Sequence, residues 1–334
     1  MIEVPQNCSN ELTAVDLFCG AGIGAYGIKK AGYNIIWAVD NDSDAVRTYN
    51  INIGNHAICE DIRNIKSIDI PKHDLMIATP VCKPFSVCGA RRLTKDEKYG
   101  DLLAETLRLF SECKSKALFF ENVAGLVYDA SLPIFLDFCK EIEGNKYQVY
   151  WSLVNCWDLG VPQERIRVFL VAISDDVDYE FVAPKKLIFG KTNQYDAFYD
   201  LKNKTIFDIK NHNTDVIKHF DNEMVVKHRQ RSWEYPAYTV LSDADSMQYY
   251  PEPKIINWED LEKLPRRLSV REHLRLQTVG DDFYFPDDVS VREQYNRCSG
   301  IPSLVAYKYG VNIADCLLGK TNKLKNKSHR RSLF

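Results

Sequence analysis

The stretch LTAVDLFCGAGIGAYGIKKAGYNIIWAVD, residues 12–40, decides the fold class of this 334-residue chain. It opens with an apolar, β-rich run (12–18), passes through a turn with glycines at alternate positions, and closes with a second apolar run (35–40). Between the two runs the pattern becomes helical. Strand, glycine turn, helix and strand in this order predict the first unit of a doubly wound sheet.

The alternation of strand and helix patterns continues to about residue 173. Short apolar runs predict strands, and amphipathic segments between them predict helices. The predicted strands are 12–18, 35–40, 74–78, 117–122, 147–155 and 167–173, and the predicted helices are 101–114 and 132–144. We expect an α/β fold with a doubly wound, mostly parallel sheet and helices on both of its faces.

The chain is longer than a single hydrophobic core usually supports, so we expect two domains. After about residue 180 the sequence becomes richer in Asn, Asp, Lys and aromatic residues, and a helical pattern returns only at 303–317. We predict a catalytic domain formed by 1–180 together with 295–318. A smaller, irregular domain spans 181–294, and a disordered basic tail spans 319–334.

Composition points to a cytosolic protein. The amino-terminal residues are polar, without the pattern of a signal peptide, and no apolar run approaches the ~18 residues that span a bilayer. Ten cysteines without repeated CxxC pairs fit neither a zinc ribbon nor a disulfide framework, so we expect reduced thiols.

The net charge of −3 does not indicate a nucleic-acid-binding protein, but basic residues cluster at 227–231, 265–275 and 320–331. Local clusters decide whether a polyanion can bind. The alternative for each cluster is an ordinary solvated surface.

The glycine turn (20–24) suits a ligand that approaches the backbone closely. Asp40 ends the next strand, where a carboxylate can bond ribose hydroxyls. Asp61 is followed by apolar Ile62, an arrangement that can contact the edge and the face of an adenine. We expect a nucleoside-containing cofactor here, and a purely structural turn is the alternative.

A candidate nucleophile lies in ATPVCKPFSVCG, residues 78–89. Cys82 stands between Pro80 and Pro84, directly after the 74–78 strand, and the prolines restrict the backbone around it. A cysteine on a stiffened loop at the carboxyl end of a strand is placed like a nucleophile. The alternative is a small buried hydrophobic residue, as many cysteines are.

Three charged residues are candidates for the chemistry. Glu121 ends an apolar strand, where an unpaired carboxylate is costly, so it can donate a proton to a ring nitrogen or share one with it. Arg165 and Arg167 occupy alternate positions of a predicted strand, so both can point into one cleft. An ordinary ion pair is the alternative for each of the three.

The glycine turn, Pro-x-Cys-x-Pro-Phe-Ser, Glu-Asn-Val and Gln-x-Arg-x-Arg occur in this order, followed by RRLSVREHLRLQ (266–277) and the 295–318 segment. Over nearly its whole length the chain therefore resembles the DNA cytosine-5 methyltransferase family, in particular bacterial restriction–modification enzymes. The resemblance implies a Rossmann-like fold that binds S-adenosylmethionine. It also implies methyl transfer to C5 of a cytosine in a specific duplex DNA sequence, with no metal.

The resemblance also implies a role for each matching residue. Cys82 adds to C6 of a cytosine that has been flipped out of the duplex, while Glu121 engages the N3 and amino edge. The other residues at the cytosine are Pro80, Arg165 and Arg167. Those at the cofactor are Phe18, Gly20, Gly22, Asp40, Asn41, Asp61, Ile62, Leu102 and Ser299. Those at DNA are Ser86, Arg91 and Arg92 on a loop that closes over the base, and Arg229, Arg231 and Thr239 in the target region.

The sequence departs from the family pattern at Val81 and Lys83 beside Cys82, at Ile23 in the glycine turn, in the closing motif and in the target region. RCSGIPSLVAY (297–307) lacks the usual Gly-Asn pair, whose role at the cofactor's methionine portion is assigned to Ser299. RSWEYPAYTV (231–240) resembles the target region of methyltransferases that recognise GGCC, but Asp243, Ala244 and Asp245 follow it in place of a basic reader. The same target sequence and a different one both stay open.

Two other functions stay open. An RNA cytosine-5 methyltransferase of the same fold, as in the tRNA-modifying relatives, usually carries Cys-Phe-Thr in the target region, which this chain lacks. A non-catalytic DNA-binding relative has no use for Cys82, Glu121 and Arg165 together. For the methyltransferase we expect a monomer in the cytoplasm, associated with the nucleoid, and a restriction endonuclease that acts on the same site.

Overall fold

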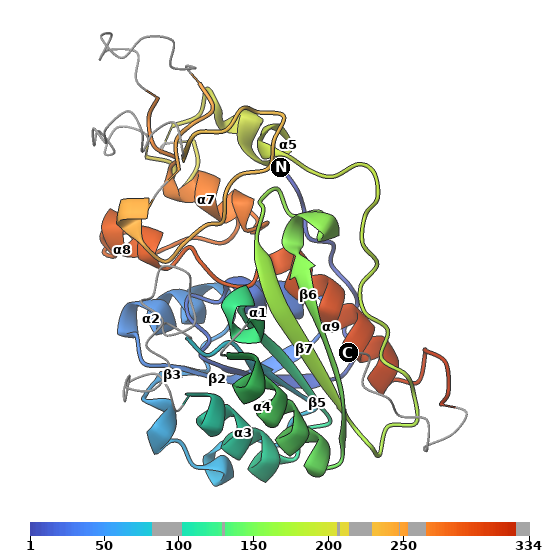
Figure 1. Cartoon of the computed structure of the whole chain (residues 1–334). Coiled ribbons are helices and arrows are strands. Elements are labelled where there is room, and N and C mark those ends of the chain that lie inside the picture. The colour runs from blue at the N-terminus through green and yellow to red at the C-terminus, as the bar shows by residue number, and fades with distance from the viewer. Residues whose placement is uncertain are drawn as a thin grey trace. The chain divides into compact units, whose positions relative to one another are not determined.

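The computed structural model describes residues 1–81, 102–128, 131–205, 208–213, 229–246, 248–252 and 265–324 (Figure 1). The chain divides into two compact units. We call the first the sheet unit; it consists of Gln6–Val154, Ile166–Pro184 and Tyr307–Phe334. The second, the target unit, consists of Met1–Pro5, Asn155–Arg165 and Lys185–Ala306. The predicted catalytic and target-recognition domains are functional divisions and stay a prediction.

The described part of the chain contains a seven-stranded sheet in the order β3-β2-β1-β4-β5-β7-β6. Its strands are β1 (Thr13–Leu17), β2 (Asn34–Asp40), β3 (Ala57–Cys59), β4 (Leu75–Ala78), β5 (Ala117–Val123), β6 (Tyr147–Asn155) and β7 (Ile166–Ser174). The pairs β1–β2, β1–β4, β2–β3 and β4–β5 are parallel, whereas β7 runs antiparallel to β5. The doubly wound, mostly parallel sheet is therefore confirmed, and each predicted strand lies within one residue of its expected bounds.

The short strand β3 was not predicted. Its three residues contain one buried position followed by two exposed ones. A run this short carries no periodic signal, because at least four to eight residues are needed to distinguish strand alternation. Its pairing with β2 exists only once the chain has folded.

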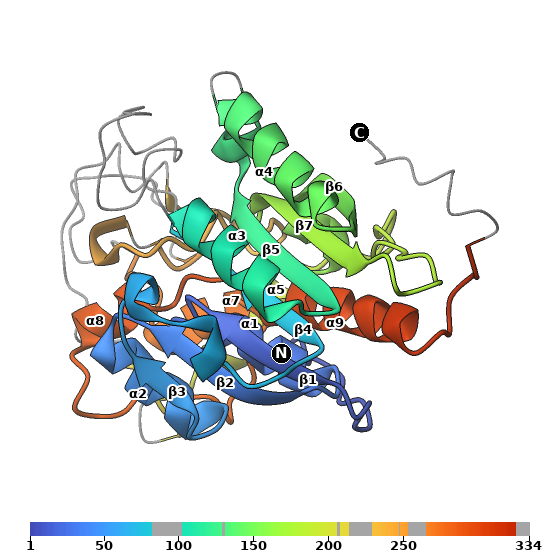
Figure 2. The same ribbon diagram turned by 90° about the horizontal axis from the view of Figure 1, so that it is seen from below.

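Helices cover both faces of the sheet, as the two views in Figure 1 and Figure 2 show. The helices that belong mainly to the sheet unit are α1 (Ile23–Lys30), α2 (Ser43–Asn52), α3 (Leu102–Cys113), α4 (Leu132–Gly144) and α9 (Ser303–Leu317). The predicted helices 101–114, 132–144 and 303–317 correspond to α3, α4 and α9.

The alternation of side chains along β5 explains how both faces are filled. Leu118 and Phe120 belong to the hydrophobic cluster that includes the buried residues of α3 and α4. Phe119 points to the other face, where its ring lies 5.0 Å from that of Tyr309 in α9. Successive strand residues face opposite sides, so a run without polar interruptions is buried on both.

The carboxyl ends of the parallel strands meet at one edge of the sheet. Leu17 at the end of β1 lies opposite both Val39 of β2 and Ala78 of β4, and Ala78 lies opposite Phe120 of β5. The strand order reverses between β1 and β4. In doubly wound sheets, ligands bind at such a switch point, outside the carboxyl ends of the strands.

The target unit has little regular structure among its described residues. Its helices include α5 (Gln194–Phe198), α7 (Val270–Leu276) and α8 (Val291–Asn296). Trp233 lies at the centre of an aromatic cluster whose other rings are Tyr195, Phe198, Tyr199 and Tyr250. No helix among the described residues has the length and apolar character needed to cross a membrane.

Candidate active site

The glycine turn connects β1 to α1 at the carboxyl edge of the sheet unit. Gly20 and Gly22 have φ angles of 51° and 92°, in the left-handed region. A Cβ on Gly22 would lie 2.8 Å from Cγ1 of Ile53, whereas no atom lies within 4 Å of the Cβ position of Gly20. A side chain at Gly22 would therefore collide with Ile53, which directly follows α2, whereas Gly20 leaves its surroundings open to a ligand.

Asp40 at the end of β2 is bonded directly to the glycine turn. Its Oδ2 accepts a hydrogen bond from the Gly20 amide at 2.8 Å, and its Oδ1 accepts one from the Asp42 amide at 3.0 Å. Burial raises the pKa of Asp40, and the backbone hydrogen bonds oppose that rise. Each carboxylate oxygen has a second lone pair, so Asp40 can hold the turn and still accept bonds from a ligand.

The other predicted cofactor residues fall into a polar pair and an apolar group. Asn41 is exposed just after β2, and Asp61 caps a short 3₁₀ helix by accepting from the Arg63 amide at 3.0 Å. Ile62 and Leu102 are buried in the hydrophobic cluster of the sheet unit, and Phe18 packs against that cluster. These three apolar residues belong to one hydrophobic cluster or pack against it, although they lie far apart in the chain, and their contact with a cofactor stays a prediction.

Glu121 is a buried carboxylate with a positive partner. Its Oε1 lies 3.3 Å from Nε of Arg167, and the side chains are 10% and 14% exposed. The contact follows from the antiparallel register, in which Val123 lies opposite Arg167. Arg167 thus provides the counter-charge that a buried carboxylate requires.

Pro80, two residues before Cys82, is tied to the strand that carries Glu121. Asn122 donates from Nδ2 to the Pro80 carbonyl at 3.1 Å. Thr79 donates from Oγ1 to the Phe18 carbonyl at 3.0 Å, which links the end of β4 to the start of the glycine turn.

Cys82 itself lies outside the described residues, as do Ser86, Arg91 and Arg92. Sequence reasoning missed Asn122, for which the Glu-Asn-Val tripeptide was the available signal.

Arg165 and Arg167 have different partners. The strand β7 begins at Ile166, so Arg165 lies one residue before it, in the target unit. Arg165 is 4% exposed, and its Nη1 donates to the Val240 carbonyl at 3.1 Å. The expectation that both guanidinium groups point into one cleft stays a prediction.

The predicted DNA contacts of the target unit are held by intramolecular partners. Arg231 forms an ion pair with Glu164 at 2.7 Å and lies over the Tyr238 ring at 3.8 Å. Thr239 donates from Oγ1 to the Glu164 carbonyl at 2.6 Å. Arg229 donates from Nη1 to the Asp245 carbonyl at 2.6 Å. These side chains are therefore oriented on a defined surface, and their contact with DNA stays a prediction.

The two aspartates that follow the target segment, Asp243 and Asp245, also have partners within the chain. Both carboxylate oxygens of Asp245 accept from Arg292, at 3.0 and 2.7 Å, and Asp243 accepts from the Asp245 amide at 2.9 Å.

Ser299, in the altered closing motif, donates from Oγ to the Val240 carbonyl at 3.2 Å. Its predicted contact with the cofactor is untested.

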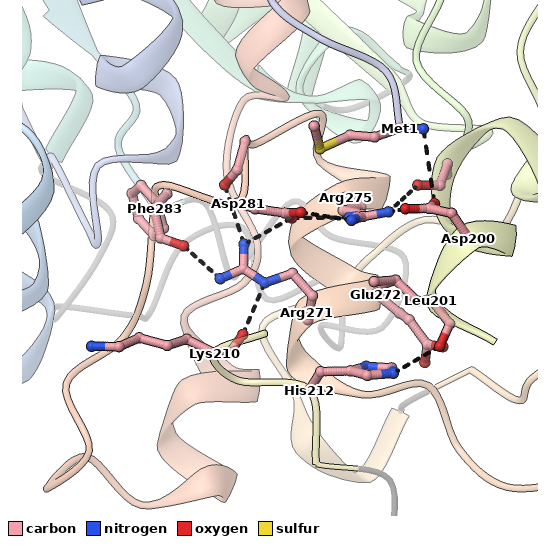
Figure 3. A network of polar contacts seen from close by, with 12 residues as sticks. Met1, Asp200, Leu201, Lys210, His212, Arg271, Glu272, Arg275, Asp281 and Phe283 are labelled. Carbon is pink, nitrogen blue, oxygen red and sulfur yellow. Dashed lines mark hydrogen bonds and ion pairs between the residues drawn. The ribbon is translucent and has the colours of Figure 1, made fainter. Parts of the chain in front are cut away.

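The basic cluster at 265–275 is not the surface that the sequence suggested. Figure 3 shows Arg271 and Arg275, four residues apart on α7, reaching the same carboxylate, Asp281. Arg271 also donates to the carbonyls of Lys210 and Phe283, and both guanidinium groups are almost fully buried. The helical repeat brings the two arginines onto one face that packs inside the target unit, so neither the solvated nor the polyanion-binding interpretation is right for them.

Glu272 on the same helix is expected to be a major contributor to stability. Its side chain is fully buried and accepts from Arg266 through both oxygens, at 2.6 and 2.8 Å. Removing one charge of a buried pair costs about 3 kcal/mol, so Glu272→Gln should lower the free energy of unfolding by that order. Urea unfolding measures it. Asp137→Asn, which removes an exposed partner of Lys140, should change stability little, and equal effects of the two variants would contradict the expectation.

Among the residues that the structure describes, no group of three or more His, Cys, Asp or Glu side chains could hold a metal ion. The absence of a metal from the reaction stays a prediction.

Sequence comparison shows which proteins share this arrangement. Residues 12–314 match the family described as C-5 cytosine-specific DNA methylase. The type II methyltransferase M.FnuDI of Fusobacterium nucleatum is 32% identical over 96% of this chain and 99% of its own length. M.NgoPII of Neisseria gonorrhoeae is 29% identical over 92% of this chain and 97% of its own length.

Solved structures share the fold. A putative DNA modification methyltransferase encoded within an E. coli prophage has a TM-score of 0.70 at 19% identity, covering 92% of this chain and all of its own. The Dnmt2 methyltransferase of S. pombe has a TM-score of 0.62 at 16% identity, covering 91% of this chain and 98% of its own. The sequence match runs from the first strand of the sheet into its last helix, and the chain therefore belongs to the C-5 cytosine-specific DNA methylase family.

Proposed function

We propose that the chain, a DNA (cytosine-5)-methyltransferase of the type II modification class, acts on a flipped-out cytosine through a covalent bond from Cys82 to C6. The observation that supports this most is the shared sheet edge. The glycine turn and Asp40 lie there beside Pro80 and Glu121, joined by the bonds of Thr79 and Asn122. A cofactor held at β1 and β2 would therefore lie at the same sheet edge as the residues that lead into Cys82.

The chemistry requires a nucleophile because C5 of cytosine is itself a poor one. The Cys82 thiolate adds to C6, and the ring electrons move toward C5. Glu121 engages the N3 and amino edge and stabilises the adduct, with its carboxylate held by Arg167. Arg165 holds the ring. Once C5 carries the methyl group, water accepts the proton from C5 and the Cys82 sulfur leaves C6 as thiolate, which restores the aromatic ring. Since C6 is inaccessible in a duplex, the base must leave the stack first.

The residues of the sheet unit fit S-adenosylmethionine, which the family uses. The open position at Gly20 admits a ligand close to the backbone, and Asp40 keeps acceptor capacity for ribose hydroxyls. Phe18, Ile62 and Leu102 provide an apolar surface for the adenine. When bound there, S-adenosylmethionine supplies an electrophilic methyl group to C5 of the activated cytosine.

Asp40→Asn should weaken S-adenosylmethionine binding at least about tenfold, because hydrogen bonds to a charged acceptor are stronger than those to an amide. The raised pKa of Asp40 gives the effect a pH dependence. Affinity should be complete above that pKa and fall as the pH drops through it, beginning at a higher pH than for an ordinary aspartate. Calorimetric titration across the pH range measures this, and an equally steep profile for the variant would contradict it.

The test of the function is transfer of a labelled methyl group to duplex DNA and to tRNA in parallel. Label in duplex DNA alone, together with a covalent complex on a duplex carrying 5-fluorocytosine, supports the proposal. Label in tRNA alone would support the RNA-modifying alternative. DNA binding without label would indicate a non-catalytic relative. Bisulfite sequencing of DNA from cells that express the chain would then reveal the methylated sequence.

We propose further that the enzyme acts as a monomer and shares its recognition site with a restriction endonuclease. The similarity to type II methyltransferases over nearly the whole chain supports the shared recognition site. DNA that the enzyme has methylated should resist cleavage by a restriction endonuclease that recognises the same sequence. Digestion of methylated and unmethylated DNA, once the methylated sequence is known, measures this.

A further inference from the structure

Ser299, in the altered closing motif, donates a hydrogen bond to the same main-chain carbonyl oxygen as Arg165. Ser299 Oγ donates to the Val240 carbonyl at 3.2 Å, and Arg165 Nη1 donates to it at 3.1 Å. A carbonyl oxygen has two lone pairs, so these two donors account for its full acceptor capacity. All three residues belong to the target unit.

The main-chain amide of Val240 is also hydrogen-bonded to a side chain. It donates to Gln163 Oε1 at 3.0 Å. Gln163 Nε2 donates to Gln277 Oε1 at 2.9 Å, and Gln277 Nε2 donates to the Cys298 carbonyl at 2.9 Å. Cys298 is covalently joined to Ser299, whose hydroxyl returns to Val240. These five residues therefore form a closed hydrogen-bonded ring, which we call the Val240 ring.

Four of the five residues of the Val240 ring are buried, and Ser299 is half-buried. Gln163, Gln277 and Cys298 are fully buried, and Val240 is 1% exposed. Hydrogen bonds in a buried network are stronger than in water, and a broken bond leaves a costly unpaired group. The ring therefore holds the Val240 carbonyl in one direction.

Ser299 closes this ring with its side chain. The segment 297–307 lacks the Gly-Asn pair that is usual in the family, and Ser299 belongs to this altered segment. The altered segment therefore provides the hydroxyl that completes the ring.

We propose that Ser299 is a positioning residue for Arg165: its hydroxyl closes the Val240 ring and thereby fixes the carbonyl that orients the guanidinium group. The inference rests on the proposed role of Arg165 at the cytosine. A guanidinium group is a planar fork, so fixing one Nη determines where its other N–H groups point. Small displacements of such a group lower the reaction rate, because the reacting atoms lose their alignment.

Ser299→Ala tests the inference. The rate of covalent trapping on a 5-fluorocytosine duplex, at saturating S-adenosylmethionine, should fall about fivefold to tenfold, the loss expected for one neutral hydrogen bond. The dissociation constant for S-adenosylmethionine, measured by calorimetry, should stay within about twofold. Ser299→Thr, which keeps the hydroxyl, should recover most of the lost rate. Ser299→Cys offers only a weak S–H donor and should give an intermediate rate.

A double-mutant cycle with Arg165→Lys tests whether Ser299 acts by positioning Arg165 or by stabilising the target unit in general. If Ser299 acts through Arg165, adding Ser299→Ala to Arg165→Lys should change the trapping rate by less than about twofold. Thr192→Val is the matched control, because Thr192 also donates a hydroxyl to a main-chain carbonyl of the target unit, that of Gly160 at 2.8 Å. Its trapping rate should equal that of the unaltered chain.

Other outcomes would overturn the inference. Additive losses in the cycle would show that the hydroxyl does not act through Arg165. A weaker affinity for S-adenosylmethionine with an unchanged trapping rate would assign Ser299 to the cofactor. If Ser299→Ala does not fold, the Thr and Cys variants decide, and equal rates for those two would refute the role of the hydroxyl. Failure of the unaltered chain to trap DNA would instead refute the proposed function, and the inference with it.

Discussion

Cys82→Ala is expected to lower the rate of methyl transfer by at least about 10⁴-fold, the scale of loss seen when a covalent catalyst loses its nucleophile. Without the sulfur no bond to C6 forms, and C5 stays too weak a nucleophile to accept a methyl group. DNA affinity should change little, because binding depends on phosphate and base contacts that a thiol does not make.

Single-turnover transfer from labelled S-adenosylmethionine measures the rate, and a salt titration of DNA binding measures the affinity. Cys8→Ala is the matched control, because Cys8 is another thiol of this chain and lies exposed on the sheet unit. Its rate should equal that of the unaltered chain. Turnover by Cys82→Ala at the normal rate would exclude Cys82 as the nucleophile.

Glu121→Gln is expected to lower the transfer rate about 10²- to 10³-fold, within the range that a positioned acid or base contributes. A glutamine cannot supply a proton to N3 or a negative charge to its edge. The change also leaves the buried guanidinium group of Arg167 without its counter-charge, so a lower melting temperature should accompany the lower rate.

A control at the opposite end of the same strands separates the two effects. Asp74 and Lys116 form an ion pair at 2.8 Å just before β4 and β5 begin. Asp74→Asn should lower the melting temperature and leave the transfer rate of the folded enzyme unchanged. If Asp74→Asn slows transfer as much as Glu121→Gln, the loss at Glu121 reflects stability and the proposed chemical role is wrong.

Local patterns in the sequence were sufficient for the framework of the sheet unit. The apolar runs and the glycine turn predict the six longer strands, and the residues after them are the ones found at the carboxyl edge. Asp40 is predicted as the last residue of the second strand, and β2 does end there, because the end of an apolar run is visible in the sequence alone. Parallel order then brings such residues to one edge, whatever their distance along the chain.

Partners far apart in the chain could not be predicted in this way. The arginines of α7 have the composition of a surface cluster, and their burial depends on Asp281 and on carbonyls that only the folded chain brings to them. Gln163 and Gln277 are 114 residues apart and bond to each other in the Val240 ring. The sequence by itself determined the longer strands of the sheet, the helices α3, α4 and α9, and the kind of chemistry, because periodicity and motif spacing are local. Tertiary structure alone decided which charge meets which partner, because that depends on the path of the whole chain.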